Sequence, residues 1–229
     1  MRISRPPHNW RVSPGKAKEI QKELARRVCT REERPSYRLA AGVDAAFSTE
    51  DSYCFGAVVL WNIKESAVRE QHTARADIAF PYIPGLLSFR EAPVIIKALR
   101  RLKEEPDILI CDGQGIAHQR RLGIASHLGV LTGLPSIGCA KSRLIGDYQT
   151  PGPAKGAGSP LTDRGERIGT VLRSRRGVKP VFVSVGHNIS LRDAEETVLA
   201  CCRKYRLPEP IRLADHLCTA AKKMQGVKK

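Results

Sequence analysis

The sequence predicts an α/β protein built on one mixed β-sheet, and three observations lead to this fold class. Three strand-like apolar runs follow one another between residues 38 and 75, separated by short polar breaks, which is typical of an antiparallel meander. Helix and strand patterns then alternate between residues 89 and 139, which indicates crossovers and a parallel part of the sheet. At 229 residues, the chain is long enough to bury one large core, so we expect a single domain over residues 1–229.

The first expected element is a helix in a basic N-terminal flank at about residues 1–35. Ser13 suits the N-cap and Pro14 the first turn, and the apolar residues that follow at three- and four-residue steps give the helix one apolar stripe. The meander comes next, with expected strands at 38–47, 53–61 and about 66–75 and polar breaks at 48–52 and 62–65.

After the meander, the expected elements are a helix at about 89–103, a strand at 107–111, a helix at about 121–132 and a short strand at 135–139. Residues 149–160 are too rich in Gly and Pro for a helix or a strand and predict a loop. The remaining expected elements are strands at 167–172 and 180–185, a helix from a capping box at Ser190 to about residue 205, and a last helix at 211–224.

The composition indicates a polyanionic partner in a reducing compartment. The chain carries 39 Lys and Arg against 23 Asp and Glu, a net charge of +16, so nucleic acid is the leading candidate. Apolar stretches fall short of the roughly 18 residues of a spanning helix and of a signal peptide, so we expect a soluble, cytoplasmic protein without membrane contact. The seven cysteines lack Cys-x-x-Cys spacing, and six lie in or beside apolar segments as expected core residues.

Three acidic residues occur where an isolated buried carboxylate would be costly. Asp44 lies inside an apolar strand, where Asp is strongly disfavoured, and Asp112 ends a second apolar strand. Glu91 follows an aromatic loop at residues 81–89. A divalent cation would explain all three, because such cations take oxygen ligands. Two alternatives stay open, since Asp112 could start a turn before glycine and Glu91 could complete a capping box with Ser88.

Other side chains could assist such a site. His216 borders the apolar stripe of the last helix, which is compatible with a packing role or with proton transfer. Tyr82, held between two prolines, is a rigid loop aromatic that either packs on the domain or stacks on a base. Four basic residues follow the two expected parallel strands and could hold phosphates or be ordinary solvated charges: Arg120, Arg121, Lys141 and Arg143.

Taken together, these residues resemble the endonuclease V family, the deoxyinosine 3′ endonucleases. The resemblance spans about residues 39–224 and implies a ribonuclease H-like fold, in agreement with the antiparallel start and parallel continuation. It is carried by the blocks Gly42-Val-Asp44, Pro81-Tyr-Ile-Pro-Gly-Leu-Leu-Ser-Phe-Arg-Glu91, Asp112-Gly-Gln-Gly-Ile-Ala-His118, Arg120-Arg-Leu-Gly-Ile-Ala-Ser126 and Cys139-Ala-Lys-Ser-Arg143. Gln119 departs from the proline usual in the family and affects only the local loop.

The resemblance also implies a role for each candidate residue. Asp44, Asp112 and Glu91 would be metal ligands and, with His216 and Lys141, the catalytic residues; Mg²⁺ would be the cofactor, with Mn²⁺ as an expected substitute. Tyr82 would be part of a strand-separating wedge with Pro81, Ile83 and Pro84. The base pocket would be lined by the backbone of Gly85, Leu87, Gly113 and Ile124.

The implied activity is hydrolysis of the second phosphodiester bond 3′ of inosine in DNA, giving 3′-hydroxyl and 5′-phosphate ends. Independently of the resemblance, we expect a monomer. A metal ion would lower the pKa of bound water and neutralise charge on the phosphate. The base would have to leave the duplex, because hypoxanthine differs from adenine only on edges that pairing hides. Two alternatives stay open, cleavage of inosine-containing RNA and nucleic-acid binding without catalysis.

Overall fold

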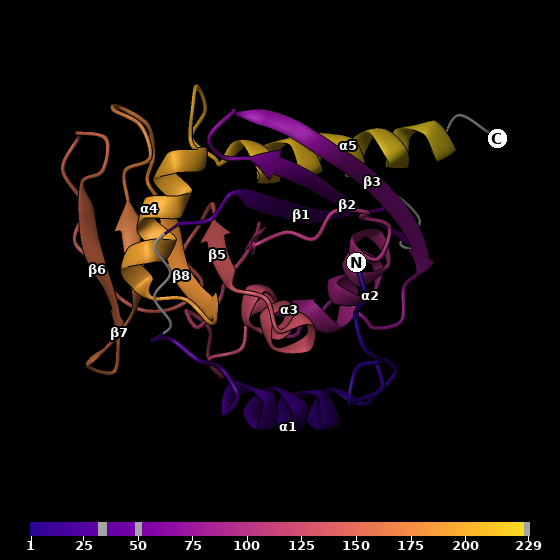
Figure 1. Cartoon of the computed structure of the whole chain (residues 1–229). Helices are drawn as coiled ribbons and strands as arrows, with labels where there is room; N and C mark the ends of the chain where they lie inside the picture. The colour runs from indigo at the N-terminus through magenta and orange to yellow at the C-terminus, as the bar shows by residue number, and fades with distance from the viewer. Residues whose placement is uncertain (32–35, 49–51, 227–229) are drawn as a thin grey trace.

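The computed structural model describes residues 1–31, 36–48 and 52–226, and it is organised around one eight-stranded sheet (Figure 1). The strand order is β3-β2-β1-β4-β5-β8-β7-β6. Residues 32–35 of the expected basic flank, residues 49–51 of the first polar break and residues 227–229 lie outside the described residues.

The sheet combines an antiparallel start with a parallel centre, as the sequence predicts. Strands β1 (Leu39–Phe47), β2 (Tyr53–Asn62) and β3 (Ala67–Asp77) form the antiparallel meander. Strands β4 (Ile108–Cys111) and β5 (Ser136–Ala140) continue from β1 in parallel. Antiparallel pairing then resumes with β8 (Val181–His187), β7 (Glu166–Leu172) and β6 (Gly158–Asp163).

Helices cover both faces of this sheet. On one face, α2 (Leu87–Leu99) and α3 (Ile124–Thr132) pack on alternate residues of β1 and β4. On the other face, α4 (Leu191–Cys201) and α5 (Glu209–Gly226) pack on the intervening residues. Helix α1 (Pro14–Ala25) forms an outer layer below α2 and α3 (Figure 1). Ser13 caps α1 as expected, its Oγ accepting from the Lys16 amide.

One strand was missed by the sequence prediction, because β6 begins inside the Gly- and Pro-rich stretch expected to be a loop. Pro160 lies in β6, where its missing N–H is tolerated because β6 is at the edge of the sheet. The expected start of α3 at residue 121 was also wrong. At Gly123 the backbone lies so close to Gln114 that a Cβ would meet its carbonyl oxygen at 2.2 Å, and the helix begins only after this contact.

Helix α5 lies against β1 at a glycine. A Cβ at Gly42 would fall 2.1 Å from the carbonyl carbon of Pro210, so only glycine permits this backbone approach. Three buried residues of α5, Ile211, Ala214 and Cys218, complete the contact with the sheet. The close approach places Asp215 and Cys218 of α5 beside Asp44, which lies within β1.

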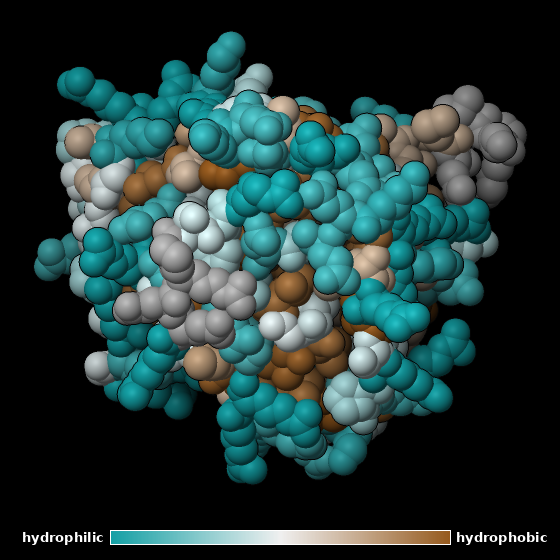
Figure 2. Space-filling view, viewed as in Figure 1, coloured by the Kyte–Doolittle hydropathy of each residue, from teal (hydrophilic) through white to brown (hydrophobic). Residues whose placement is uncertain are grey.

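Two expectations about composition can be compared with the structure. The six cysteines expected in the core are buried, and Cys29 is exposed. Within the described residues, no helix has both the length and the hydrophobicity needed to cross a bilayer. The face of the molecule shown in Figure 2 is mostly hydrophilic, with an apolar area over the region of α3.

Candidate active site

Two of the predicted acids are neighbours because their strands are paired in parallel. The register places Val43 of β1 opposite Cys111 of β4, and the Asp112 amide donates to the Val43 carbonyl at 3.4 Å. Asp44 and Asp112 therefore occupy equivalent positions, one residue further along adjacent strands. This is the carboxyl-terminal edge of the parallel strands, where open α/β sheets commonly build their sites.

A third acid, Asp215, comes from α5. One ligand atom from each of Asp44, Asp215 and Cys218 lies within 4.8 Å of the other two. Asp215 and Cys218 are three residues apart, so they lie on the same face of the helix. The close contact of α5 with Gly42 is what brings this face over Asp44.

Glu91 completes the acidic cluster from α2. The capping-box interpretation of Ser88 and Glu91 is wrong, because α2 begins at Leu87 with Leu86 at the N-cap and no side-chain cap. Ser88 instead pairs with His127 at 2.9 Å. Glu91 is only 9% exposed, and burial together with the charges of Asp44 and Asp112 raises its pKa to about 8.

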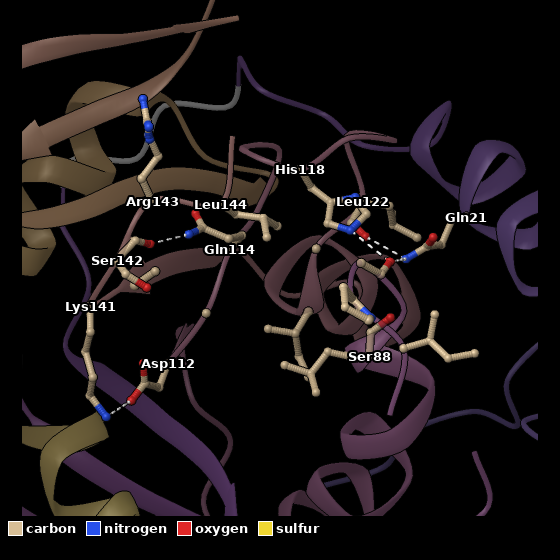
Figure 3. Close-up of a pocket in the computed structure, with 18 of the residues that line it drawn as sticks. Gln21, Ser88, Asp112, Gln114, His118, Leu122, Lys141, Ser142, Arg143 and Leu144 are labelled. Atoms are coloured by element: carbon tan, nitrogen blue, oxygen red, sulfur yellow. Dashed lines mark hydrogen bonds and ion pairs between the residues drawn. The ribbon is translucent and has the colours of Figure 1, made fainter. Parts of the chain in front are cut away.

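Burial also disfavours the ionised forms of Asp44 and Asp112 in the metal-free protein. Burial, followed by the charge of Asp112, raises the pKa of Asp44 to about 7. Burial raises the pKa of Asp112 as well, although Lys141 opposes this with an ion pair at 2.6 Å (Figure 3). Asp44 and Glu91 are therefore partly protonated at neutral pH unless positive charge is supplied.

The donor set fits a hard divalent cation. The cluster contains four carboxylates: Asp44 from β1, Glu91 from α2, Asp112 from the end of β4 and Asp215 from α5. A bound cation would relieve the repulsion between them. Cys218 adds a thiol, which Mg²⁺ does not favour as a ligand. Asp44 and Asp215 have ligand atoms within 4.8 Å of each other and could bind an ion jointly, and Asp112 is already paired with Lys141.

We expect the stability of the metal-free protein to fall as the pH rises from about 4 to about 8. A carboxyl group whose pKa is raised on folding binds more protons in the folded state than in the unfolded state. Its contribution to the free energy of unfolding is therefore complete at pH values below its unfolded pKa, and it is lost as the pH rises through its folded pKa. With Asp44 near 7 and Glu91 near 8, the loss should be on the order of a few kcal/mol. Urea unfolding in chelator at pH 5 and pH 8.5 measures it.

The Glu91→Gln variant is the control for this pH dependence. It removes one buried charge, so the metal-free variant should be more stable than the wild type at pH 8.5 and should lose less stability between the two pH values. Added Mg²⁺ should stabilise the wild type more at pH 8.5 than at pH 5, because the cation binds the ionised carboxylates. A wild type that gains stability with pH in chelator would contradict this description of the cluster.

A pocket of about 390 Å³ opens beside the acids (Figure 3). Asp112 and Lys141 line one side of it, and His118, Leu122 and Gln21 line the other. All four residues predicted for the base pocket line it: Gly85, Leu87, Gly113 and Ile124. Three residues of the predicted wedge, Tyr82, Ile83 and Pro84, line it too. Its volume is in the range of small-molecule sites.

The structure places three other predicted residues elsewhere. Arg120 donates to the carbonyl of Gly85, and Arg121 pairs with Asp163 at 2.8 Å and Glu166 at 2.9 Å. Contact of these arginines with DNA stays a prediction. His216 is exposed on α5, rather than at the border of the core as expected, and among the described residues it forms no hydrogen bond or ion pair with the acids.

Sequence reasoning missed Asp215 because it chose the wrong stripe on the last helix. The residues assumed to face the core, such as Leu213 and Leu217, are only partly buried, whereas Ile211, Ala214 and Cys218 are fully buried. Counted from Ile211, Asp215 occupies the i+4 position of the i, i+3, i+4, i+7 pattern, between Ala214 and Cys218. An acid within an apolar stripe indicates a functional residue, for the same reason that Asp44 stands out in its apolar strand. This signal could have identified Asp215.

The fold and the acids define a class of protein. A mixed sheet with carboxylates at the ends of its central strands and helices on both faces is a ribonuclease H-like architecture, as expected from the sequence. The family model described as Endonuclease V matches residues 22–216. The chain belongs to the endonuclease V family and is an endonuclease.

Individual relatives agree with this assignment. An endonuclease V of Alkalilimnicola ehrlichii is 51% identical over 214 residues, covering 93% of this chain and 94% of the relative. The crystal structure of endonuclease V from Streptomyces avermitilis has a TM-score of 0.92 at 43% identity, covering 96% of this chain and 97% of that one. Ciona intestinalis endonuclease V, in complex with a 24mer DNA containing an inosine followed by a ribo-adenosine, has a TM-score of 0.82 at 28% identity, covering 92% and 98%.

Proposed function

We propose that this chain is a Mg²⁺-dependent endonuclease that binds inosine in DNA and hydrolyses the second phosphodiester bond on its 3′ side, as a monomer and as the first step of repair. The observation that supports this most is the position of the acids directly beside the pocket. Asp112 belongs to the acidic cluster, Lys141 is paired with it, and both side chains also line the pocket. A base held in the pocket would keep its strand next to the carboxylates. Mn²⁺ should replace Mg²⁺, since both take oxygen ligands.

The roles of the residues follow from their charges and contacts. A divalent cation would be held by Asp44 and Asp215, with Glu91 and Asp112 beside them, and when bound it lowers the pKa of water and neutralises charge on the phosphate. Lys141 favours the ionised form of Asp112, and nearly half of the Lys141 side chain is exposed, so its ammonium can also face a phosphate. The protons on Asp44 and Glu91 leave when the cation binds.

Cleavage of a labelled duplex with a single inosine tests the proposal. The protein should nick the inosine strand in Mg²⁺, leave it intact in chelator, and leave the matched adenosine duplex intact in both. The fragment length should place the cut at the second phosphodiester 3′ of inosine. An uncut inosine strand in Mg²⁺, with salt-sensitive binding retained, would instead show a nucleic-acid binding protein without catalysis.

Tyr82 should contribute to binding of the lesion strand. Its side chain is 68% exposed at the rim of the pocket, on a loop between Pro81 and Pro84, so a nucleic acid can reach the ring. We expect Tyr82→Ala to weaken binding of the inosine duplex by about 1–3 kcal/mol, the usual loss when one stacked base is released. Fluorescence anisotropy in Ca²⁺ measures this, and Tyr82→Phe, which keeps the ring, is the control. Wild-type affinity in Tyr82→Ala would contradict a stacking role.

Inosine in RNA is a second candidate substrate. The complex of the Ciona protein contains a ribo-adenosine directly after the inosine, so a ribonucleotide at that position is compatible with binding in that relative. Single-turnover rates on DNA, on RNA and on DNA with one ribonucleotide after the inosine would rank the substrates. Faster cutting of RNA than of DNA would replace the DNA proposal.

A further inference from the structure

Gln21 is a buried polar residue on a helix that otherwise packs through apolar side chains. It is 1% exposed, and its neighbours on the same face of α1 are Ala17, Ile20 and Leu24. A buried amide is costly unless its donors and acceptor are satisfied, so its partners show what it does. Gln21 lies before the first strand, yet it lines the pocket beside the acids.

The Gln21 amide connects the two sides of one pocket wall. Its Nε2 donates to the carbonyl of Gly85 at 3.0 Å and to the carbonyl of Leu122 at 3.2 Å. Its Oε1 accepts from Arg120 Nε at 2.5 Å. Gly85 belongs to the loop that carries Tyr82, and Leu122 precedes α3. Figure 3 shows Gln21 reaching from α1 toward His118 and Leu122.

The Gly85 carbonyl is the centre of this network. His118 Nε2 donates to it at 2.9 Å and Arg120 Nη2 at 2.6 Å, in addition to Gln21. The His118 Nδ1 accepts from the Arg120 amide at 3.1 Å, which leaves the proton on Nε2. Burial lowers the pKa of His118 to about 4, so the ring is neutral at pH 7 and keeps this arrangement.

Orienting this carbonyl fixes the loop. Gly85 has a φ of +78°, a conformation that glycine adopts readily. Because a peptide unit is planar, the direction of the Gly85 carbonyl also sets that of the Leu86 N–H, which closes a turn onto the Ile83 carbonyl at 2.9 Å. Ile83, Pro84, Gly85 and Leu87 form part of the pocket wall, so the shape of this wall depends on the donors that hold the Gly85 carbonyl.

We propose that Gln21 is a positioning residue that holds the pocket wall in the shape that selects the lesion base, so that substrate affinity depends on it and the rate of bond cleavage does not. This rests on the proposed function, in which the pocket receives the base. The Gln21 amide forms its hydrogen bonds with Gly85, Leu122 and Arg120 and, within the described residues, with none of the four carboxylates. It therefore acts on recognition through Gly85 and Leu122.

Two substitutions separate the contributions of the amide. Gln21→Leu removes all three hydrogen bonds while retaining much of the volume. Gln21→Glu keeps the acceptor for Arg120 but replaces the Nε2 donor with a carboxylate oxygen that faces the carbonyls of Gly85 and Leu122. The Gly85 carbonyl keeps its donors from His118 and Arg120, and the link between Gly85 and Leu122 is lost. Leu24→Ala is the matched control, because it loosens the packing of α1 without touching the network.

Single-turnover cutting at increasing enzyme concentration gives the half-saturating concentration and the maximal rate. On the inosine duplex, we expect the half-saturating concentration of both Gln21→Leu and Gln21→Glu to rise about tenfold or more. We expect their maximal rate to stay within about threefold of the wild type. Affinity for the matched adenosine duplex should stay the same. Leu24→Ala should keep the wild-type half-saturating concentration.

Hydrogen exchange of the peptide covering residues 81–90 gives a readout independent of cutting. Exchange at Leu86 should be faster in both Gln21 variants than in Leu24→Ala and the wild type. Unchanged exchange and half-saturation in folded Gln21→Glu, or equal changes in Leu24→Ala, would overturn the proposal. A wild type that does not cut inosine would refute the proposed function, and the exchange data would still decide whether Gln21 holds the loop.

Discussion

Asp215→Asn should lower the maximal rate of inosine-strand cleavage by on the order of 10³-fold or more. Asn keeps the size of the side chain and removes the negative charge that Asp215 places beside Asp44. The affinity for a divalent cation should fall, and binding of the inosine duplex in the absence of metal should stay the same. Single-turnover kinetics across Mg²⁺ concentrations measure both the rate and the apparent metal affinity.

His216→Gln is the control variant for Asp215→Asn. The sequence resemblance assigns catalysis to His216, whereas the structure shows His216 exposed and brings Asp215 to the acids. We expect His216→Gln to lose less than about tenfold in rate. A loss of rate in His216→Gln that equals or exceeds the loss in Asp215→Asn would contradict the role given to Asp215 and would show that His216 transfers the proton.

Gly42→Ala should destabilise the fold by several kcal/mol or prevent folding. The added Cβ would lie 2.1 Å from the Pro210 carbonyl carbon and 2.4 Å from its oxygen, which is far inside contact distance, and both partners are backbone. Helix α5 would have to move away from β1, taking Asp215 with it. Urea unfolding measures the free energy, and residual folded protein should have lost its response to Mg²⁺.

Gly15→Ala is the matched control for this substitution. Gly15 lies in the exposed first turn of α1, and the nearest atom to a Cβ there is 3.9 Å away. This change should stabilise the protein by about 0.5–1 kcal/mol, because alanine loses less backbone entropy in a helix. If Gly42→Ala were tolerated as well as Gly15→Ala, the close contact of α5 with β1 could not be what positions Asp215.

The central sheet could be predicted from sequence because its strands have continuous apolar patterns. Residues 39–47 and 53–62 are apolar enough to indicate buried strands, and the alternation after residue 86 indicates the parallel part. Strand β6 could not be predicted in the same way. Pro160 and Gly158 are unfavourable in the interior of a sheet, and they are tolerated here because β6 is an edge strand.

The candidate site was predictable where an acid contradicts its local surroundings. Asp44 stands out in an apolar strand, whereas Asp215 lies in a helix whose buried face is visible only once the helix is docked. Gln21 is a further example, since nothing in the sequence of α1 indicates that its amide meets Gly85 and Leu122. Contacts between segments about 65 to 100 residues apart depend on tertiary packing, which local patterns do not contain.

The most direct test of the cation site is anomalous scattering from crystals soaked in Mn²⁺. We predict a peak in contact with the carboxylates of Asp44 and Asp215, on the side facing Glu91 and Asp112, and its loss in Asp44→Asn crystals. Activity in the same Mn²⁺ concentration should be measured in parallel. An active protein whose crystals show no Mn²⁺ at these carboxylates, or show it only elsewhere, would contradict the account.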